Sequence, residues 1–208
     1  MVAARDLFDR GLNTGTAGNV SVRYSDWALI TPSGVRYDAL EPSQIVEIDM
    51  EGNVEGRLRP SSEWRFHLDL YRSRPEVGAI VHTHPPHGTA VAALRRDLPA
   101  FHYMVAVAGG ATVRCAPYAT FGTQLLSDYV QRALEDRTAC LLANHGMVAV
   151  GETLEQATQL AIEVEMLCRM YLITLAAGEP HLLSDEEMAE VLAKFEDYRN
   201  PPPRKPWE

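Results

Sequence analysis

The feature that most constrains the fold is a long periodic segment at residues 154–177. Its apolar positions recur every three or four residues: Leu154, Ala157, Ala161, Val164, Cys168, Tyr171 and Leu175. This spacing predicts an amphipathic helix whose apolar face is buried against other elements. Thr153 with Gln156 predicts a capping box at its start, and Gly178 predicts its end.

The other segments alternate between helical and extended patterns. Further helices are predicted at 3–11, from Ser61 or Ser62 through Arg74, at 88–94, at 123–134 and after Ser184, with Glu187 as its capping partner. Strands are predicted at 20–24, 28–31, 45–49, 77–81, 112–115, 139–142 and 147–150. We expect one α/β domain over residues 1–200 and a Pro-rich tail at 201–208. The alternation by itself favours parallel βαβ units.

Composition excludes several classes of protein. A chain of 208 residues with 46% apolar residues buries a core without needing a disulfide or a metal to fold. The 19 Lys and Arg against 28 Asp and Glu give a net charge of −9, which argues against a nucleic-acid groove.

The chain also lacks the patterns of exported and membrane proteins. No apolar run reaches the roughly 18 residues of a membrane span, and charges at Arg5, Asp6, Asp9 and Arg10 interrupt any signal-peptide core. The three cysteines are an odd number without metal-like spacing, typical of reduced, buried thiols. We therefore expect a soluble cytoplasmic protein with neither a nucleic-acid nor a membrane partner.

Histidines supply the most informative motif. His82 and His84 lie two residues apart after an apolar run, so on a strand both imidazoles project to one face and can start a zinc site. His145, in a turn after the apolar run 140–142, is a third candidate ligand, because a catalytic zinc site keeps three protein ligands and one open position. A lone His-x-His and a turn histidine also occur without metal. His87 follows two prolines and is interpreted as a supporting or surface residue.

The segment Pro60-Ser-Ser-Glu63 allows two interpretations. In one, Ser61 or Ser62 caps a helix and Glu63 lies in the first turn, where a negative charge is favourable. In the other, Glu63 is an acid/base near a metal while the serines and the helix N-terminus hold an anion. The small-residue loops 15–19 and 31–34 can also direct N–H groups at a phosphate, although each is also an ordinary turn.

Taken in order, these segments resemble the class II (zinc) sugar-phosphate aldolases of the aldolase/adducin family. The resemblance rests on Gly18-Asn19, Thr31–Gly34, Pro60–Glu63, His82-x-His84 and Asn144-His-Gly146, and it extends from Gly11 to about Tyr198. The stretches 11–24, 60–67, 102–104 and 115–123 make it specific, and the chain is most similar to the L-fuculose-1-phosphate aldolases. It departs from them at the non-ligand residues of 82–87, and it starts later, so we expect a shortened first helix.

The resemblance implies a fold and an assembly. It implies a single class II aldolase domain with a central, mostly antiparallel sheet flanked by helices, which replaces the parallel arrangement suggested by alternation alone. It also implies a homotetramer with active sites at the subunit interfaces, and a sugar phosphate as the small-molecule partner.

The resemblance also implies roles for individual residues. His82, His84 and His145 match the zinc ligands, and Glu63 matches an acid/base that also reaches the metal. Residues matched to phosphate binding are Gly18, Asn19, Ser33, Gly34, Ser61 and Ser62. Tyr103 matches a catalytic tyrosine supplied across the subunit boundary, and Phe121 and Tyr198 match residues that shape the aldehyde end.

The implied reaction is the reversible cleavage of a ketose 1-phosphate of the L-fuculose type. Its products are dihydroxyacetone phosphate and a small aldehyde such as L-lactaldehyde. Alternatives are an aldolase for 5-deoxyribulose 1-phosphate or 5-(methylthio)ribulose 1-phosphate, a pentulose-phosphate 4-epimerase, a methylthioribulose-phosphate dehydratase and a non-catalytic adducin-like module. Against the last alternative, the three histidines and Glu63 are all retained.

Overall fold

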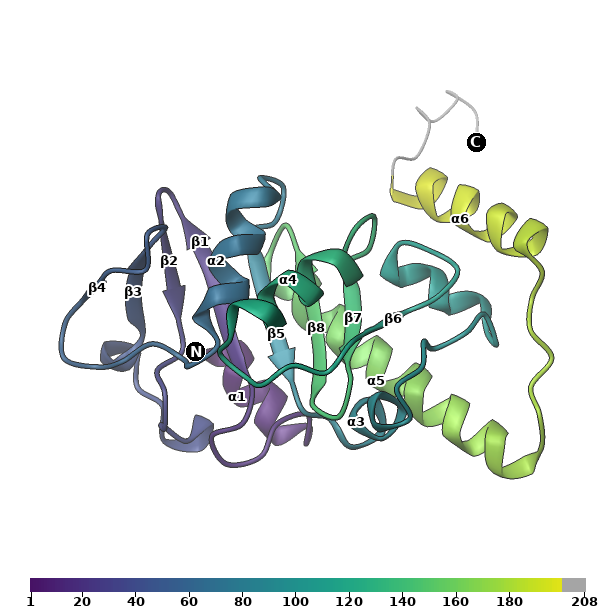
Figure 1. Cartoon of the computed structure of the whole chain (residues 1–208), viewed down its shortest axis with the longest axis horizontal. Coiled ribbons are helices and arrows are strands. Elements are labelled where there is room, and N and C mark those ends of the chain that lie inside the picture. Colours follow the sequence, from purple (N-terminus) through teal and green to yellow (C-terminus); the bar gives the residue numbers. More distant parts are fainter. Residues whose placement is uncertain (200–208) are drawn as a thin grey trace, which may run out of the picture.

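One eight-stranded sheet runs through the structure, a computed structural model that describes residues 1–199 (Figure 1). The strand order is β4-β3-β2-β1-β5-β8-β7-β6. The strands are β1 (Asn19–Tyr24), β2 (Trp27–Ile30), β3 (Val46–Asp49), β4 (Val54–Glu55), β5 (Ala79–Thr83), β6 (Arg114–Ala116), β7 (Ala139–Leu142) and β8 (Gly146–Gly151). Every adjacent pair is antiparallel except β6 with β7. The mostly antiparallel sheet is therefore confirmed, and the parallel units expected from alternation alone are wrong.

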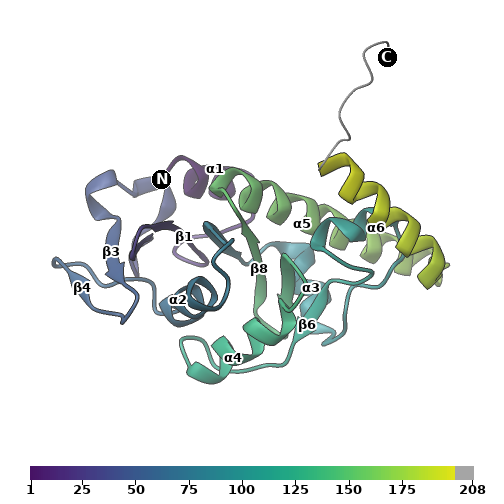
Figure 2. The ribbon, with the colours of Figure 1, turned by 90° about the horizontal axis from the view of Figure 1, so that it is seen from above.

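Helices cover both faces of this sheet. Figure 2 shows α1 (Val2–Asp9) and α5 (Leu154–Ala177) on one side and α2 (Trp64–Ser73) and α4 (Gln124–Ala133) on the other. The helix α3 (Pro86–Ala93) packs against α5. Each face has its own apolar core. The central strands β5 and β8 are buried on both faces, which explains their continuous apolar sequence.

The long helix α5 has the predicted bounds, and its predicted buried face is confirmed. Ala157, Ala161, Val164, Cys168 and Tyr171 are all buried. The Thr153 hydroxyl accepts from the backbone N–H of Gln156, and the Gln156 side chain accepts in return. The helix covers β8 and β5, so it anchors the middle of the sheet from one side.

The last helix, α6 (Asp185–Arg199), packs at the far end of the molecule (Figure 1). Ser184 and Glu187 cap it reciprocally, as predicted. Met188 is buried against Ala100 and against Ala106 of the 3-10 helix η3 (Tyr103–Ala108). The side chain of Tyr198 and the predicted tail at 201–208 lie outside the described residues.

Several local predictions need correction. The short strand β4 and the 3-10 helices at Tyr37–Ala39, Pro42–Gln44 and Tyr103–Ala108 were not predicted, because such short elements carry little periodicity. The helix α2 begins at Trp64, so neither Ser61 nor Ser62 is its N-cap. No described helix is long and apolar enough to cross a membrane. The three cysteines are unpaired, as expected.

Antiparallel pairing brings distant segments to one edge of the sheet. Asn19 at the start of β1 pairs with His82 near the end of β5. Thr83 at the end of β5 pairs with Met147 near the start of β8. The turn between β7 and β8 holds His145 at this same edge. The candidate histidines therefore meet because neighbouring strands run in opposite directions.

Candidate metal centre

Four side chains converge where β5 ends and β8 begins. One ligand atom from each of Glu63, His82, His84 and His145 lies within 4.8 Å of the other three. His84 Nε2 lies 3.0 Å from His82 Nε2, and Glu63 Oε2 lies 3.1 Å from the same His82 atom. Glu63 Oε1 lies 3.5 Å from His145 Nε2. These are the residue types that zinc prefers.

The electrostatics of the cluster favour a cation at its centre. His82 Nδ1 donates to the carbonyl of Met147 at 2.9 Å, so Nε2 is the ring nitrogen that faces the other ligand atoms. Burial and the neighbouring His82 lower the pKa of His84 to about 3 and that of His145 to about 4, so both imidazoles are neutral. Neutral nitrogen lone pairs and a carboxylate facing one point fit a divalent metal ion.

Glu63 occupies the N-cap position of α2 without capping it. Its backbone is not helical (φ −104°, ψ 15°). Its side chain faces His82 and Asn19, and Asn19 Nδ2 donates to Oε2 at 3.0 Å. Burial opposes ionisation of Glu63, but positive charge at His82 and the hydrogen bonds from His82 and Asn19 hold its pKa well below its usual range. Oε1 is buried and has no hydrogen-bond partner. Glu63 is thus an ionised carboxylate with one free oxygen.

The predicted phosphate loops lie next to each other. Pro32 and Pro60 form a β-bridge, Ser61 N–H donates to Thr31 O at 3.0 Å, and Ser33 N–H donates to Arg59 O at 3.0 Å. The Ser61 hydroxyl accepts from Glu63 N–H at 3.3 Å, which joins these loops to the cluster. The loops 31–34 and 60–63 therefore bring Ser33, Gly34, Ser61 and Ser62 to the side of Glu63.

Gly18 lies directly against the cluster. Its φ of +77° is a left-handed conformation that favours glycine. A Cβ there would lie 2.4 Å from Asn13 Oδ1 and 2.6 Å from the carbonyl oxygen of His82. Gly18 therefore allows the start of β1 to approach the strand that carries His82.

The remaining candidates differ in how the structure places them. Phe121 is exposed and precedes Gly122, where a Cβ would lie 2.6 Å from the carbonyl of Ser62, so its loop adjoins the phosphate loops. Tyr103 is 51% exposed, and no described hydrogen bond or ring contact joins it to the cluster. His87 lies outside the cluster, because its Nδ1 contacts Glu165 Oε1 at 2.6 Å.

Sequence reasoning missed a set of buried polar residues behind Glu63. Asn13 accepts from the backbone N–H of His84 at 3.2 Å, and the Ser21 hydroxyl forms hydrogen bonds with both His67 and Tyr71. A signal for His67 and Tyr71 was present, because they follow Glu63 at intervals of four and so share one helix face. Asn13 had no comparable signal.

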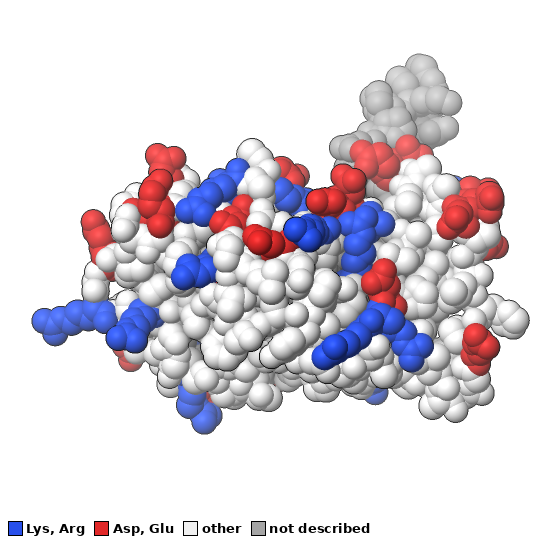
Figure 3. All heavy atoms as spheres, in the orientation of Figure 1, with Lys and Arg blue, Asp and Glu red and all other residues white. Residues whose placement is uncertain are grey.

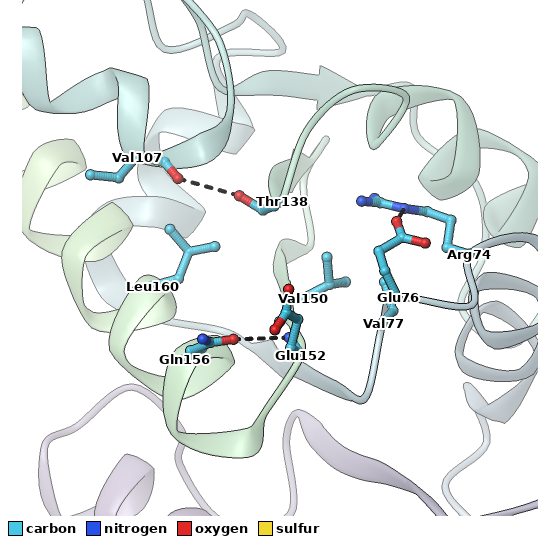
Figure 4. Close-up of a pocket in the computed structure, with 10 residues that line it drawn as sticks. Arg74, Glu76, Val77, Val107, Thr138, Val150, Glu152, Gln156 and Leu160 are labelled. Atoms are coloured by element: carbon cyan, nitrogen blue, oxygen red, sulfur yellow. Dashed lines mark hydrogen bonds and ion pairs between the residues drawn. The ribbon is translucent and has the colours of Figure 1, made fainter. Parts of the chain in front are cut away.

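A separate hollow lies at the opposite end of β5 and β8 (Figure 4). It has a volume of about 350 Å³. Arg74 on its wall donates to Glu76 and to two backbone carbonyls, and Gln156 accepts from the backbone of Glu152. The Arg74 guanidinium and the amide oxygen of Gln156 are therefore already paired within the protein. On the face in Figure 3, acidic and basic side chains are interspersed, without a broad area of one sign.

Comparison with known proteins assigns the chain to a family. Residues 1–172 match the family described as "Class II Aldolase and Adducin N-terminal domain". The chain is 56% identical over 189 residues to an L-fuculose phosphate aldolase of Escherichia coli, covering 90% of this chain and 88% of that protein. It is 55% identical over 196 residues to a 5-methylthioribulose-1-phosphate/5-deoxyribulose-1-phosphate aldolase of Rhodospirillum rubrum, covering 94% and 89%.

Solved structures agree with this assignment. An L-fuculose 1-phosphate aldolase superposes with a TM-score of 0.89 at 43% identity, covering 93% of this chain and 92% of that one. The L-fuculose-1-phosphate aldolase of Thermus thermophilus superposes with a TM-score of 0.74 at 32% identity, covering 87% and 95%. The fold, the metal-ligand cluster and these likenesses together show that the chain belongs to the class II aldolase and adducin family, on its aldolase branch of carbon–carbon lyases.

Proposed function

We propose that this chain reversibly cleaves a ketose 1-phosphate of the L-fuculose type to dihydroxyacetone phosphate and a small aldehyde. The observation that carries the proposal is the cluster of three imidazoles and Glu63, whose Oε1 accepts no hydrogen bond and whose backbone N–H donates to Ser61 on one of the two small-residue loops. The L-fuculose phosphate aldolases similar to this chain support the substrate class.

His82, His84 and His145 would hold a zinc ion, with Glu63 able to reach it. The zinc ion would supply Lewis-acid stabilisation of the negative charge that develops when the C3–C4 bond breaks. The proposal for Glu63 is proton transfer at C3. Its low pKa keeps it ionised at neutral pH, which is the form that takes the C3 proton of dihydroxyacetone phosphate in the synthetic direction.

The phosphate-binding part of the proposal uses neutral donors. Ser33, Gly34, Ser61 and Ser62 lie on the two bridged loops, and Asn19 lies at their inner end beside Glu63. Backbone N–H groups and hydroxyls of such loops can hold a phosphate. Anchoring this end of the substrate would fix C3 near Glu63 and make proton transfer effectively unimolecular.

A neighbouring subunit would complete the site. Tyr103 is half-exposed and makes no described contact with the cluster, which fits a side chain that acts on another subunit. In this proposal the chain is a homotetramer, and the partner subunit's Tyr103 acts at the C4 oxygen while Phe121 and Tyr198 shape the aldehyde end. The unpaired cysteines are typical of a protein in a reducing compartment, and we propose that this compartment is the cytoplasm.

The test is a panel of phosphorylated ketoses with a coupled readout of dihydroxyacetone phosphate. We expect product formation from L-fuculose 1-phosphate that stops on metal removal and returns with zinc. Absence of dihydroxyacetone phosphate from every ketose would refute the aldolase proposal and point to an epimerase or a dehydratase instead.

A second substrate is supported by one observation. The aldolase of Rhodospirillum rubrum that acts on 5-methylthioribulose 1-phosphate and 5-deoxyribulose 1-phosphate is 55% identical over 94% of this chain. These ketoses share the phosphate-bearing half of the substrate, so the loops and the cluster would serve both. The pocket for the aldehyde end discriminates by only a few kcal/mol per methyl or thioether group, and the ratio of kcat/KM values across the panel decides between them.

A further inference from the structure

A ladder of polar side chains crosses the space between β1 and α2, behind Glu63. Its members are Asn19, Ser21 and Arg23 on β1, and Glu63, His67 and Tyr71 at the start and along one face of α2. Alternate residues of a strand share one face, and residues four apart share one side of a helix, so the two rows oppose each other. Apart from Arg23, all members are almost completely buried.

Consecutive side chains of this set are joined by hydrogen bonds. The Tyr71 hydroxyl lies 2.7 Å from the Ser21 hydroxyl, which lies 2.7 Å from His67 Nδ1. His67 Nε2 lies 2.5 Å from Asn19 Oδ1, and Asn19 Nδ2 lies 3.0 Å from Glu63 Oε2. The result is an unbroken chain from Tyr71 to the candidate base.

The chemistry of the groups fixes the direction of every bond. The carboxylate of Glu63 only accepts, so the amide of Asn19 must present its NH2 group to Oε2 and its oxygen to His67. His67 must then carry its proton on Nε2, which leaves Nδ1 to accept from the Ser21 hydroxyl. Ser21 in turn accepts from the Tyr71 hydroxyl. All four donors point toward Glu63.

Arg23 lies at the Tyr71 end of this series of hydrogen bonds. Its guanidinium lies 4.8 Å from the centre of the Tyr71 ring and donates to the carbonyls of Tyr71, Arg74 and Val77. Burial lowers the pKa of His67 to about 3, which keeps its imidazole neutral, as the direction of the chain requires. Polar groups buried this deeply are costly unless they are hydrogen-bonded, and these bonds satisfy the side chains of Asn19, Ser21, His67 and Tyr71.

We propose that Tyr71, Ser21 and His67 are positioning residues that lock the Asn19 amide in the orientation that donates to Glu63 Oε2. A rotated amide would instead set its oxygen against the carboxylate and repel it. With Oε2 held, Oε1, which accepts no hydrogen bond and lies 3.5 Å from His145 Nε2, is the oxygen left to act at the substrate. This role rests on the proposed proton transfer by Glu63 at C3. Tyr71, Ser21 and His67 would support that transfer without touching the substrate.

The first measurement is the tautomer of His67 in the metal-free protein, read from its imidazole ¹⁵N signals. His67→Gln identifies the signals by their loss. We expect wild-type His67 to be neutral with the proton on Nε2. A proton on Nδ1, or a protonated ring at neutral pH, would overturn the proposal, because Asn19 would then not be held as described. This result is independent of any activity.

The second measurement is the zinc-loaded enzyme's exchange of the C3 hydrogen of dihydroxyacetone phosphate with deuterium from heavy water. We expect Ser21→Ala to lower kcat about 10-fold to 100-fold, as removal of a supporting hydrogen bond does in metal sites. We expect about 5-fold for Tyr71→Phe, which removes one neutral hydrogen bond at the end of the chain. kcat should fall by a larger factor than KM rises in both variants, because neither residue is proposed to touch the phosphate and KM changes only through displacement of Asn19.

The matched control is Ser127→Ala. Ser127 is a fully buried serine on α4 whose hydroxyl donates to Asp69 at 2.6 Å, outside the chain behind Glu63. It should keep wild-type kcat at equal zinc content. Full kcat in both Ser21→Ala and Tyr71→Phe, or an equal loss in Ser127→Ala, would overturn the positioning role. If wild-type enzyme exchanges no deuterium, the proposed function fails, whereas the tautomer of His67 still tests the chain.

Discussion

Replacement of Gly18 by alanine should damage both stability and metal binding. The new Cβ would lie 2.6 Å from the carbonyl oxygen of His82, so that oxygen would have to move about 0.8 Å to reach the 3.4 Å at which ordinary contacts begin. The φ of +77° adds about 1–2 kcal/mol of backbone strain, and overpacking typically adds about 1–3 kcal/mol. We therefore expect Gly18→Ala to lower the free energy of unfolding by about 2–5 kcal/mol.

A matched variant separates strain from steric clash. Gly11 has nearly the same φ, +74°, but a Cβ there meets nothing within 4 Å, so Gly11→Ala should cost only the strain of about 1–2 kcal/mol. Urea denaturation of both metal-free variants gives the difference. Zinc affinity, measured by competition with a chelating dye, should fall about 10-fold to 100-fold in Gly18→Ala alone, because its clash moves His82. Equal losses of stability and unchanged zinc affinity would show that Gly18 does not support the cluster.

Three further predictions address the cluster and its surroundings. Glu63→Gln should lower C3 deuterium exchange by roughly two to four decades, whereas Tyr103→Phe should keep exchange and lose cleavage; equal loss of exchange would contradict separate roles. Metal analysis should find zinc lost from His84→Ala but retained in His87→Ala, since His87 pairs with Glu165 outside the cluster. Because the pKa of His67 is about 3 when folded and 6.5 when unfolded, the unfolded chain binds the extra proton between these values. Metal-free stability should therefore fall as pH drops below 6.5, by up to about 1.4 kcal/mol per unit, and urea titrations of His67→Gln should show a shallower slope.

The sequence predicted correctly those features whose determinants lie close together in the chain. The helix α5 has the predicted bounds because its apolar spacing and both of its ends are encoded within the segment itself. His82 and His84 project together because they lie two residues apart at the end of β5. In both cases the interactions that decide the structure are close in sequence.

Features that depend on distant partners were not predictable in this way. The antiparallel order of the sheet came from the family resemblance, because helix–strand alternation alone favoured parallel units. The serines at 61 and 62 have the composition of an N-cap, but α2 starts after them, and its N-cap residue Glu63 contacts His82 and Asn19 from other elements. His67 is spaced four residues from Glu63, yet its role depends on Ser21, a residue of another element.

The charge of the chain suggests why this site would use a metal ion. A protein with a net charge of −9 has to bind a phosphate ester that is itself anionic. The loops Thr31–Gly34 and Pro60–Glu63 contain no Lys or Arg, and the histidines beside them, His84 and His145, are neutral. A divalent ion against the single carboxylate of Glu63 leaves the site one positive charge in excess. Metal removal should therefore weaken binding of dihydroxyacetone phosphate as well as abolish turnover, which calorimetry can measure; undiminished binding would mean that the loops alone hold the substrate.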